Sequence, residues 1–119
     1  MLKQFIAAVV LFYSGAAQAG TCDVAESQLP GAWQDASGDG HFEVFSLQKQ
    51  AKGNLFHSWL HQRPEIVSAG WTYRDCILTI TPEPAGMEPM RFRVLSASSA
   101  TLHLRDTSDG SDAVYRRLD

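Results

Sequence analysis

The sequence has only two cysteines, no run of basic residues and no hydrophobic stretch long enough to cross a membrane. Ten Lys or Arg residues stand against thirteen Asp or Glu residues, and the net charge is −3 at pH 7. Since nucleic-acid-binding surfaces are basic, this balance argues against a nucleic-acid partner. The chain also lacks internal repeats and long helical patterns, and no set of residues in it indicates a particular reaction.

The first 19 residues have the pattern of a secretory signal peptide. Lys3 supplies one positive charge, an uncharged apolar run covers residues 5–13, and Ala17-Gln18-Ala19 has the small-x-small form of a cleavage site. The apolar run is too short to span a bilayer. A first helix of the fold is the alternative, but no polar residues would give that helix a second face. We therefore expect cleavage after Ala19, one mature domain over residues 20–119, and a periplasmic or secreted location.

In an exported chain the two cysteines most simply pair, which predicts a Cys22–Cys76 disulfide. The chain-entropy model gives such a bond a stabilisation of about 4 kcal/mol. The alternative is that Cys22 is the lipidated cysteine of a lipoprotein. The preceding Ala19-Gly20-Thr21 lacks the usual Leu and the small residue immediately before the cysteine, and lipidation would leave Cys76 unpaired.

Apolar and polar residues alternate in several short runs, as they do in half-buried β-strands. Residues 66–81 hold two such runs that meet near Arg74-Asp75, and we interpret this stretch as the central hairpin. Met90, Phe92 and Val94 are expected to point inward, between outward-pointing arginines. Residues 101–105 and 113–118 alternate in the same way.

The sequence also predicts the turns and loops between these runs. Residues 23–29 can form one or two helical turns before Pro30, and residues 37–40 are expected to form a hairpin turn. Between positions 41 and 49 the apolar residues change parity, which predicts a β-bulge. Residues 63–65 are expected to end the strand that begins at Leu55. The prolines between 82 and 89 predict a loop.

About eight short strands at spacings near ten residues favour an all-β fold, a small antiparallel up-and-down barrel with a short N-terminal helical turn. Closure into a barrel removes the exposed edges that make an open sheet prone to aggregate.

Several short motifs resemble those of the small bacterial lipocalin-like domains of the calycin group. They are Gly31-Ala32-Trp33, Gly70-Trp71 followed by Leu78-Thr79-Ile80, Thr101-Leu102-His103-Leu104 and Tyr115-Arg116. The resemblance implies that Trp33 packs across the barrel floor under a basic residue of the last strand, Arg116 or Arg117. The chain is shorter than typical lipocalins and lacks a C-terminal helix, so the barrel can hold packed side chains in place of a deep ligand cup.

Three patterns suggest chemistry, and each has a simpler explanation. On a strand, His57 and His61 would stand roughly 13 Å apart, too far to share one metal ion. Ser58 would point away from the adjacent His57, so the two cannot form a nucleophile–base pair. The Asp106–Asp112 loop has a calcium-like composition, but Gly110 falls where a ligand is needed and no Glu follows. We therefore expect no metal, no cofactor and no enzyme activity.

The strand after Leu55 places large apolar residues on both of its faces. They can all be core or girdle residues, but one of the two faces must be exposed, covered by a loop or used for binding. We expect ligand contacts from Phe56, Trp59, Leu60 and Trp71. Two hypotheses follow. The protein holds a small hydrophobic ligand, or it is an envelope protein-binding module, such as an inhibitor or accessory subunit, with a packed barrel and recognition by the loops 82–89 and 106–112.

Overall fold

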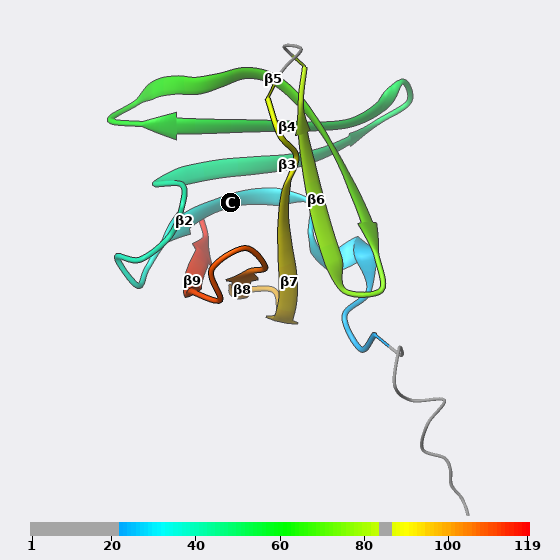
Figure 1. Ribbon diagram of the computed structural model, residues 1–119, viewed down its shortest axis with the longest axis vertical. Coiled ribbons are helices and arrows are strands. Elements are labelled where there is room, and N and C mark those ends of the chain that lie inside the picture. The colour runs from blue at the N-terminus through cyan, green and yellow to red at the C-terminus, as the bar shows by residue number, and fades with distance from the viewer. Residues whose placement is uncertain (1–21, 84–86) are drawn as a thin grey trace, which may run out of the picture.

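The computed structural model describes residues 22–83 and 87–119, in which eight strands form a closed antiparallel barrel. Each strand pairs with its neighbours in chain order, and the last pairs with the first (Figure 1). This confirms the predicted all-β meander. The proposed signal peptide and its cleavage site lie outside the described residues. The strands are β2 (Gly31–Asp35), β3 (Val44–Gln50), β4 (Gly53–Leu60), β5 (Arg63–Arg74), β6 (Ile77–Pro82), β7 (Met90–Ala97), β8 (Thr101–Asp106) and β9 (Asp112–Arg117).

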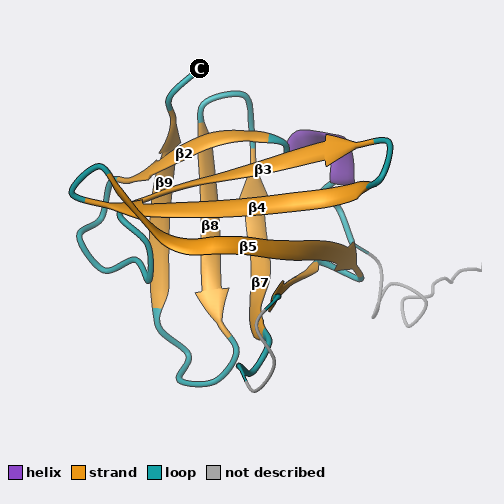
Figure 2. Ribbon diagram, turned by 90° about the horizontal axis from the view of Figure 1, so that it is seen from above, coloured by secondary structure: helices purple, strands orange, loops and turns teal. Residues whose placement is uncertain are grey.

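The barrel wall has two layers with crossed strand directions: β3, β4 and β5 run across β7, β8 and β9 (Figure 2). The long β4–β5 hairpin extends to one side of the molecule (Figure 1). A 3₁₀ turn, η2 (Glu26–Gln28), precedes Pro30, as expected for the segment before that proline.

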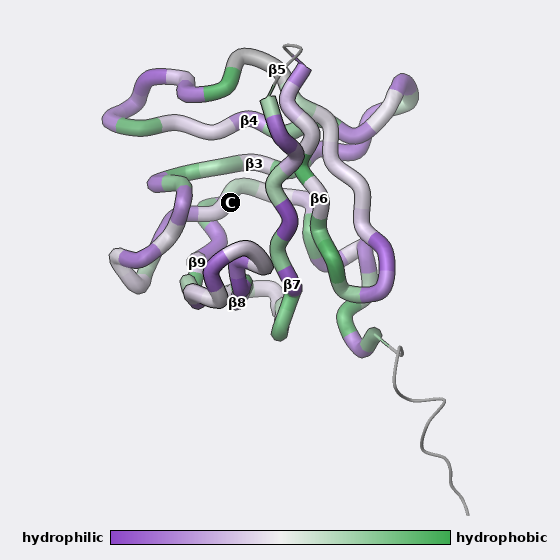
Figure 3. Tube along the Cα trace, in the orientation of Figure 1, coloured by the Kyte–Doolittle hydropathy of each residue, from purple (hydrophilic) through white to green (hydrophobic). Residues whose placement is uncertain are grey.

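Alternation along the strands builds the core between the layers. In β7, Phe92 and Val94 are buried and Met90 is partly buried, whereas Arg91 and Arg93 are exposed, and the change from apolar to polar along this strand is visible in Figure 3. In β8, Leu102 and Leu104 are buried in the same way. The alternation therefore predicted the inward faces of these strands correctly.

Aromatic rings fill the middle of the barrel. The ring of Phe42 lies 5.6 Å from that of Phe45, 5.1 Å from that of Phe56 and 5.9 Å from that of Phe92, between centroids. Phe45 meets Tyr115 edge to face at 4.9 Å. Such tilted and edge-on contacts are the favoured packing of aromatic side chains. The interior is consequently a packed aromatic core.

The predicted bulge between residues 41 and 49 is wrong. β3 begins only at Val44, and its pairing with β2 and with β4 is uninterrupted. Phe42 is buried from the preceding loop, so its parity does not have to match that of Phe45. The register shifts lie instead between β4 and β5 and between β7 and β8.

The expectation that residues 63–65 end a strand is also wrong, because β5 already begins at Arg63. The turn is His61-Gln62, and both residues have positive φ, 54° and 66°. Two positive φ values in a two-residue loop fit a type I′ turn, whose twist suits a hairpin. The predicted turn after Arg74 has the same form, with φ of 52° at Asp75 and 63° at Cys76.

The buried Trp33 ring packs against an arginine of the last strand, a contact of the kind that the family resemblance implied. The arginine is Arg117, whose guanidinium carbon lies 4.3 Å from the centroid of the Trp33 ring. Arg117 also donates hydrogen bonds to the carbonyl oxygens of Gln28, Pro30 and Ser99, at 3.2, 2.9 and 2.8 Å. Arg116, the other candidate, is exposed because it has the opposite parity on β9.

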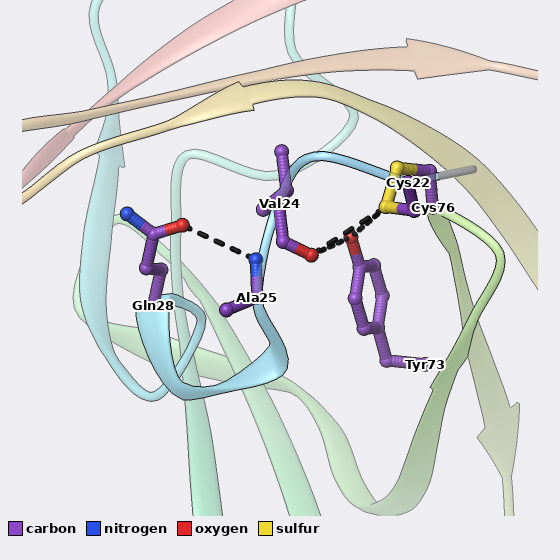
Figure 4. The surroundings of a disulfide bond; sticks show 6 residues. All are labelled: Cys22, Val24, Ala25, Gln28, Tyr73 and Cys76. Atoms are coloured by element: carbon purple, nitrogen blue, oxygen red, sulfur yellow. Dashed lines mark hydrogen bonds between the residues drawn. A yellow bond between two sulfur atoms is a disulfide. The ribbon is translucent and has the colours of Figure 1, made fainter. Parts of the chain in front are cut away.

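The disulfide joins Cys22 to Cys76, as predicted, and ties the chain before η2 to the β5–β6 turn (Figure 4). Next to it, the hydroxyl of Tyr73 donates a hydrogen bond to the carbonyl oxygen of Val24 at 2.8 Å. Burial raises the pKa of Tyr73, with a smaller contribution from Glu26. A disulfide-bonded domain is compatible with an oxidising space outside the cytoplasm.

Candidate functional site

The barrel interior has little room for a ligand. At its mouth, a void beside Phe92, Leu104 and Tyr115 has a volume of about 10 Å³, which is room for one water molecule at most. Two of the four residues predicted to contact a ligand lie in this filled interior: Phe56 is fully buried and Trp71 is 2% exposed. Neither presents a surface to the outside of the barrel.

The other two predicted residues lie outside the core. Leu60 is 45% exposed at the end of β4. Trp59 is half-buried on the outer face of the same strand, where it pairs with Val44 of β3. The four predicted residues therefore do not form one site.

Trp59 differs from the other two tryptophans in its hydrogen bonding. The indole nitrogen of Trp33 donates to the carbonyl of Leu29 at 3.0 Å, and that of Trp71 donates to the carbonyl of Gln48 at 3.2 Å. Among the described residues the Trp59 nitrogen has no such acceptor. Buried tryptophans usually satisfy this donor, so Trp33 and Trp71 have structural roles and Trp59 is left available.

The strand register places Trp59 in a row that crosses four strands on the outer face. Gln34 of β2 pairs with Val44 of β3, Val44 pairs with Trp59 of β4, and Trp59 pairs with Pro64 of β5. The alternation of each strand was readable in the sequence, but this row was not, because it depends on the register between strands.

Two open hollows flank Trp59. The polar hollow has a volume of about 440 Å³ and is lined by Gln34, Glu43, Val44, Trp59 and Gln62. The apolar hollow has a volume of about 240 Å³ and is lined by His57, Trp59, Pro64 and Ile66. Trp59 forms a wall of both, so one side chain joins a polar and an apolar surface.

The carboxylate of the polar hollow is held in place by the β4–β5 turn. One oxygen of Glu43, Oε1, accepts a hydrogen bond from the main-chain N–H of His61 at 2.7 Å. The Nδ1 atom of His61 lies 3.9 Å from the same oxygen. The second oxygen, Oε2, has no partner within residues 22–83 and 87–119. Glu43 therefore offers a fixed anionic acceptor at the edge of the hollow.

Next to the apolar hollow, half of β5 has a free edge. β6 pairs with β5 only from Ala69 to Arg74. Along residues 63–68, the edge of β5 away from β4 consequently has no strand partner in the described part of the chain. Pro64 is tolerated there because no neighbouring strand needs its N–H. The remaining main-chain groups of this edge can pair with an added strand.

The patterns that suggested metal sites do not bring ligands together. No group of three His, Cys, Asp or Glu residues in the described ranges could hold a metal ion. His57 lies beside Trp59, with ring centroids 5.9 Å apart, whereas His61 is in the turn. The two histidines therefore lie on different elements, the β4 strand and the turn that follows it.

The carboxylates of the Asp106–Asp112 loop are already engaged by protein groups, in the loop and on β8. Asp109 accepts hydrogen bonds from the main chain and hydroxyl of Ser111, and these bonds lower its pKa. Asp112 accepts from Arg105 at 2.7 Å, and this contact lowers the pKa of Asp112. The arrangement is that of a hydrogen-bonded hairpin loop.

A histidine–carboxylate pair lies at the barrel mouth and was not anticipated from the sequence. The Nε2 atom of His41 is 2.7 Å from an oxygen of Asp106. The His41 ring packs edge to face on Phe92, with centroids 5.6 Å apart. Burial raises the pKa of the neighbouring Tyr115 to about 12. The pair covers the aromatic core at this end.

Comparison with protein-family models, curated proteins and solved structures finds no match to this chain. The closed eight-strand antiparallel barrel is consistent with a calycin-like fold, and no relative identifies it further. In the described part of the chain, no helix has the length and apolar character needed to cross a membrane.

Proposed function

We propose that this chain is a periplasmic or secreted lipocalin-like module, without enzyme activity, that binds an extended polypeptide segment on the outer side of its β4–β5 hairpin. The observation that carries the proposal is the position of Trp59. It is the one tryptophan of the three without a structural hydrogen bond among the described residues, and it lies on the outer face between two hollows.

The filled interior supports a protein partner over an internal cargo. Ligand pockets normally bury most of the surface of a small molecule, and the void at the barrel mouth holds about 10 Å³. The hollows beside Trp59 are larger, at about 440 and 240 Å³, and open to the outside of the barrel. A surface of this kind suits a partner that brings its own main chain and covers the hollows from outside.

The free edge of β5 supports a partner that binds through a segment in extended conformation. A segment that adds to a sheet edge gains main-chain hydrogen bonds, and its side chains then enter pockets beside the edge. Residues 63–68 supply such an edge next to the apolar hollow. The bulged register between β4 and β5 and the proline at position 64 limit this edge to a short segment.

The test is photo-crosslinking in cells that export the full chain. A photoreactive amino acid at Gln62, in the wall of the polar hollow, is expected to capture a discrete envelope protein. Trp59→Ser should reduce that product by tenfold or more, since tryptophans at protein interfaces are frequently hot spots of about 2 kcal/mol or more. Capture that is unaffected by Trp59→Ser would contradict the proposal.

The matched control uses exposed apolar residues elsewhere. Met87 is 52% exposed and Leu118 is 51% exposed, and neither lines the hollows beside Trp59. The photoreactive group at Leu118 should not capture the same protein, and Met87→Ser should leave capture from Gln62 unchanged. The melting temperature of the Trp59→Ser protein shows whether the domain is still folded.

A small hydrophobic ligand is the second candidate, and the apolar hollow is the observation that favours it. Its lining of Trp59, Pro64, Ile66 and the ring of His57 could hold an aromatic or short-chain molecule of about its 240 Å³. Of the residues first considered for this role, only Trp59 and Leu60 present a surface. A screen of lipids and hydrophobic dyes would raise the melting temperature by mass action if this candidate holds.

A further inference from the structure

We infer that the polar hollow beside Trp59 is a site for a cationic side chain, an arginine or lysine presented by the bound polypeptide. This inference rests on the proposed function and adds to it the chemistry of the residue that is recognised. The hollow combines one aromatic face, one carboxylate and two amide side chains, from Trp59, Glu43, Gln34 and Gln62.

The first argument is the geometry of the carboxylate. The hydrogen bond from the His61 N–H fixes Oε1 of Glu43, so the side chain is oriented before any ligand arrives. Its Oε2 atom has no partner among the described residues. A carboxylate held in this way loses little conformational entropy when a cation binds to it.

The second argument is the aromatic wall. An ammonium or guanidinium group gains when it lies over an indole face, and a guanidinium can also stack on the ring. Val44 lies next to Trp59 in the cross-strand row and can contact the aliphatic stem of such a side chain. The carbonyl oxygens of Gln34 and Gln62 can accept further hydrogen bonds from its donors.

The third argument is that the cations near this hollow do not occupy it. Arg63 follows Gln62 in the chain, and Arg116 pairs with Gln34 across β2 and β9. Neither lines the hollow, and neither forms an ion pair with Glu43 in the described ranges. His61 is the nearest titratable neighbour, and its side chain is mostly exposed. An excess of acidic over basic residues in the chain adds a general attraction for cations.

The experiment is a titration of the folded protein with two synthetic peptides of alternating threonine and valine. One carries a single central arginine, and the other carries citrulline, which has the same shape without the charge. Backbone and side-chain amide NMR spectra report on the site, because the Trp59 indole and the Gln34 and Gln62 amides give their own signals. We expect these signals to shift with the arginine peptide, and its Kd to be about fivefold lower than that of the citrulline peptide.

Two variants locate the effect. Glu43→Gln keeps an acceptor for the His61 N–H and should abolish the preference for arginine, whereas Glu65→Gln, outside the hollow, should retain it. Equal Kd values for the two peptides would overturn the cation site and leave the polypeptide-binding proposal standing. An arginine preference that survives in Glu43→Gln would also overturn it, since the cation would then bind elsewhere. If neither peptide moves the three signals, the inference fails, and the crosslinking from Gln62 decides separately on the proposed function.

Discussion

At the scale of single residues, Arg117 connects more of the fold than its position near the chain end suggests. Its guanidinium covers Trp33 and donates to three carbonyl groups from η2, the following proline and the β7–β8 loop. The family resemblance implied a tryptophan–arginine pair but not which arginine takes part. The alternation along β9 identifies it. Tyr115 points inward, so Arg117, two residues later, lies on the same side of the strand and Arg116 lies on the other.

Arg117→Lys should destabilise the domain by about 1–3 kcal/mol, because one ammonium group cannot replace a planar fork that bonds several carbonyls. Arg116→Lys is the matched control and should change stability by about 0.5 kcal/mol or less, since Arg116 is exposed. Urea unfolding followed by tryptophan fluorescence measures both. Equal losses of unfolding free energy in the two variants would mean that the contacts of Arg117 stabilise the domain no more than those of an exposed arginine.

Asp35 organises the β2–β3 loop in a similar way. Burial acts to raise its pKa, but hydrogen bonds from Gly40, Ser37 and Gly38 outweigh burial, and the pKa lies below its ordinary value. A lowered folded-state pKa contributes stability that is present above about pH 4 and is lost as the pH falls through the folded pKa.

Asp35→Asn should therefore cost about 1 kcal/mol at neutral pH. The variant should also lose less stability than the parent protein when the pH is lowered below about 4. Unfolding free energies measured by urea titration at a series of acidic pH values provide the test. Parallel pH profiles for parent and variant would show that this carboxylate is not a source of the acid sensitivity.

At the scale of the element, the β4–β5 hairpin was the hardest part to predict. Its turn, His61-Gln62, has none of the Asn-Gly or Asp-Gly signals of a type I′ turn. Pro64 suggested a break for the same reason that proline is rare within sheets. The proline is accommodated because the adjacent edge of β5 has no strand partner in the described part of the chain. The strands whose alternation is regular, such as β7 and β8, were predicted correctly.

The His61-Gln62 turn gives a prediction about backbone strain. Gln62 has a φ of 66°, a region that costs non-glycine residues about 1 kcal/mol or more. Gln62→Gly should relieve this cost. Glycine also gives the unfolded chain more conformational entropy, which offsets part of the gain, so the net stabilisation should be about 0.5 kcal/mol. Gln48→Gly, at an exposed position within β3, should instead destabilise it by about 0.5–1 kcal/mol. Thermal unfolding of the two variants and the parent protein provides the test. If both variants have lower melting temperatures than the parent, Gln62 is not strained.

At the scale of the whole molecule, closure of the barrel was predictable from the count and spacing of strands. Whether the interior is hollow or packed with side chains was not predictable. Residues 20–119 include nine aromatic residues, a number compatible with a lined cup or with a solid core. Only the three-dimensional arrangement decides between them: the strands place Phe45, Phe56 and Phe92 in the interior, and the loop before β3 adds Phe42 to the same cluster. The same arrangement sets Trp59 apart on the outside.

The Cys22–Cys76 disulfide acts on the whole chain, since it closes a loop with a sequence separation of 54. In the chain-entropy model its removal should lower the free energy of unfolding by about 4 kcal/mol. The double variant Cys22→Ser, Cys76→Ser, compared with the oxidised protein by urea unfolding, gives this difference. A loss well under 1 kcal/mol would show that Tyr73 and Val24 already hold the N-terminal segment without the bond.

The central claim is that the barrel is solid and binds from its outer side. It is tested most directly by methyl NMR of the folded protein during titration with a long-chain fatty acid and with the arginine-containing peptide. We predict that the methyl groups of Leu78, Leu102 and Leu104, all buried in the core, keep their positions with both additions. The peptide should shift only the signals around Trp59. Saturable shifts of the core methyl groups with the fatty acid would contradict the account, because they would place a ligand inside the barrel.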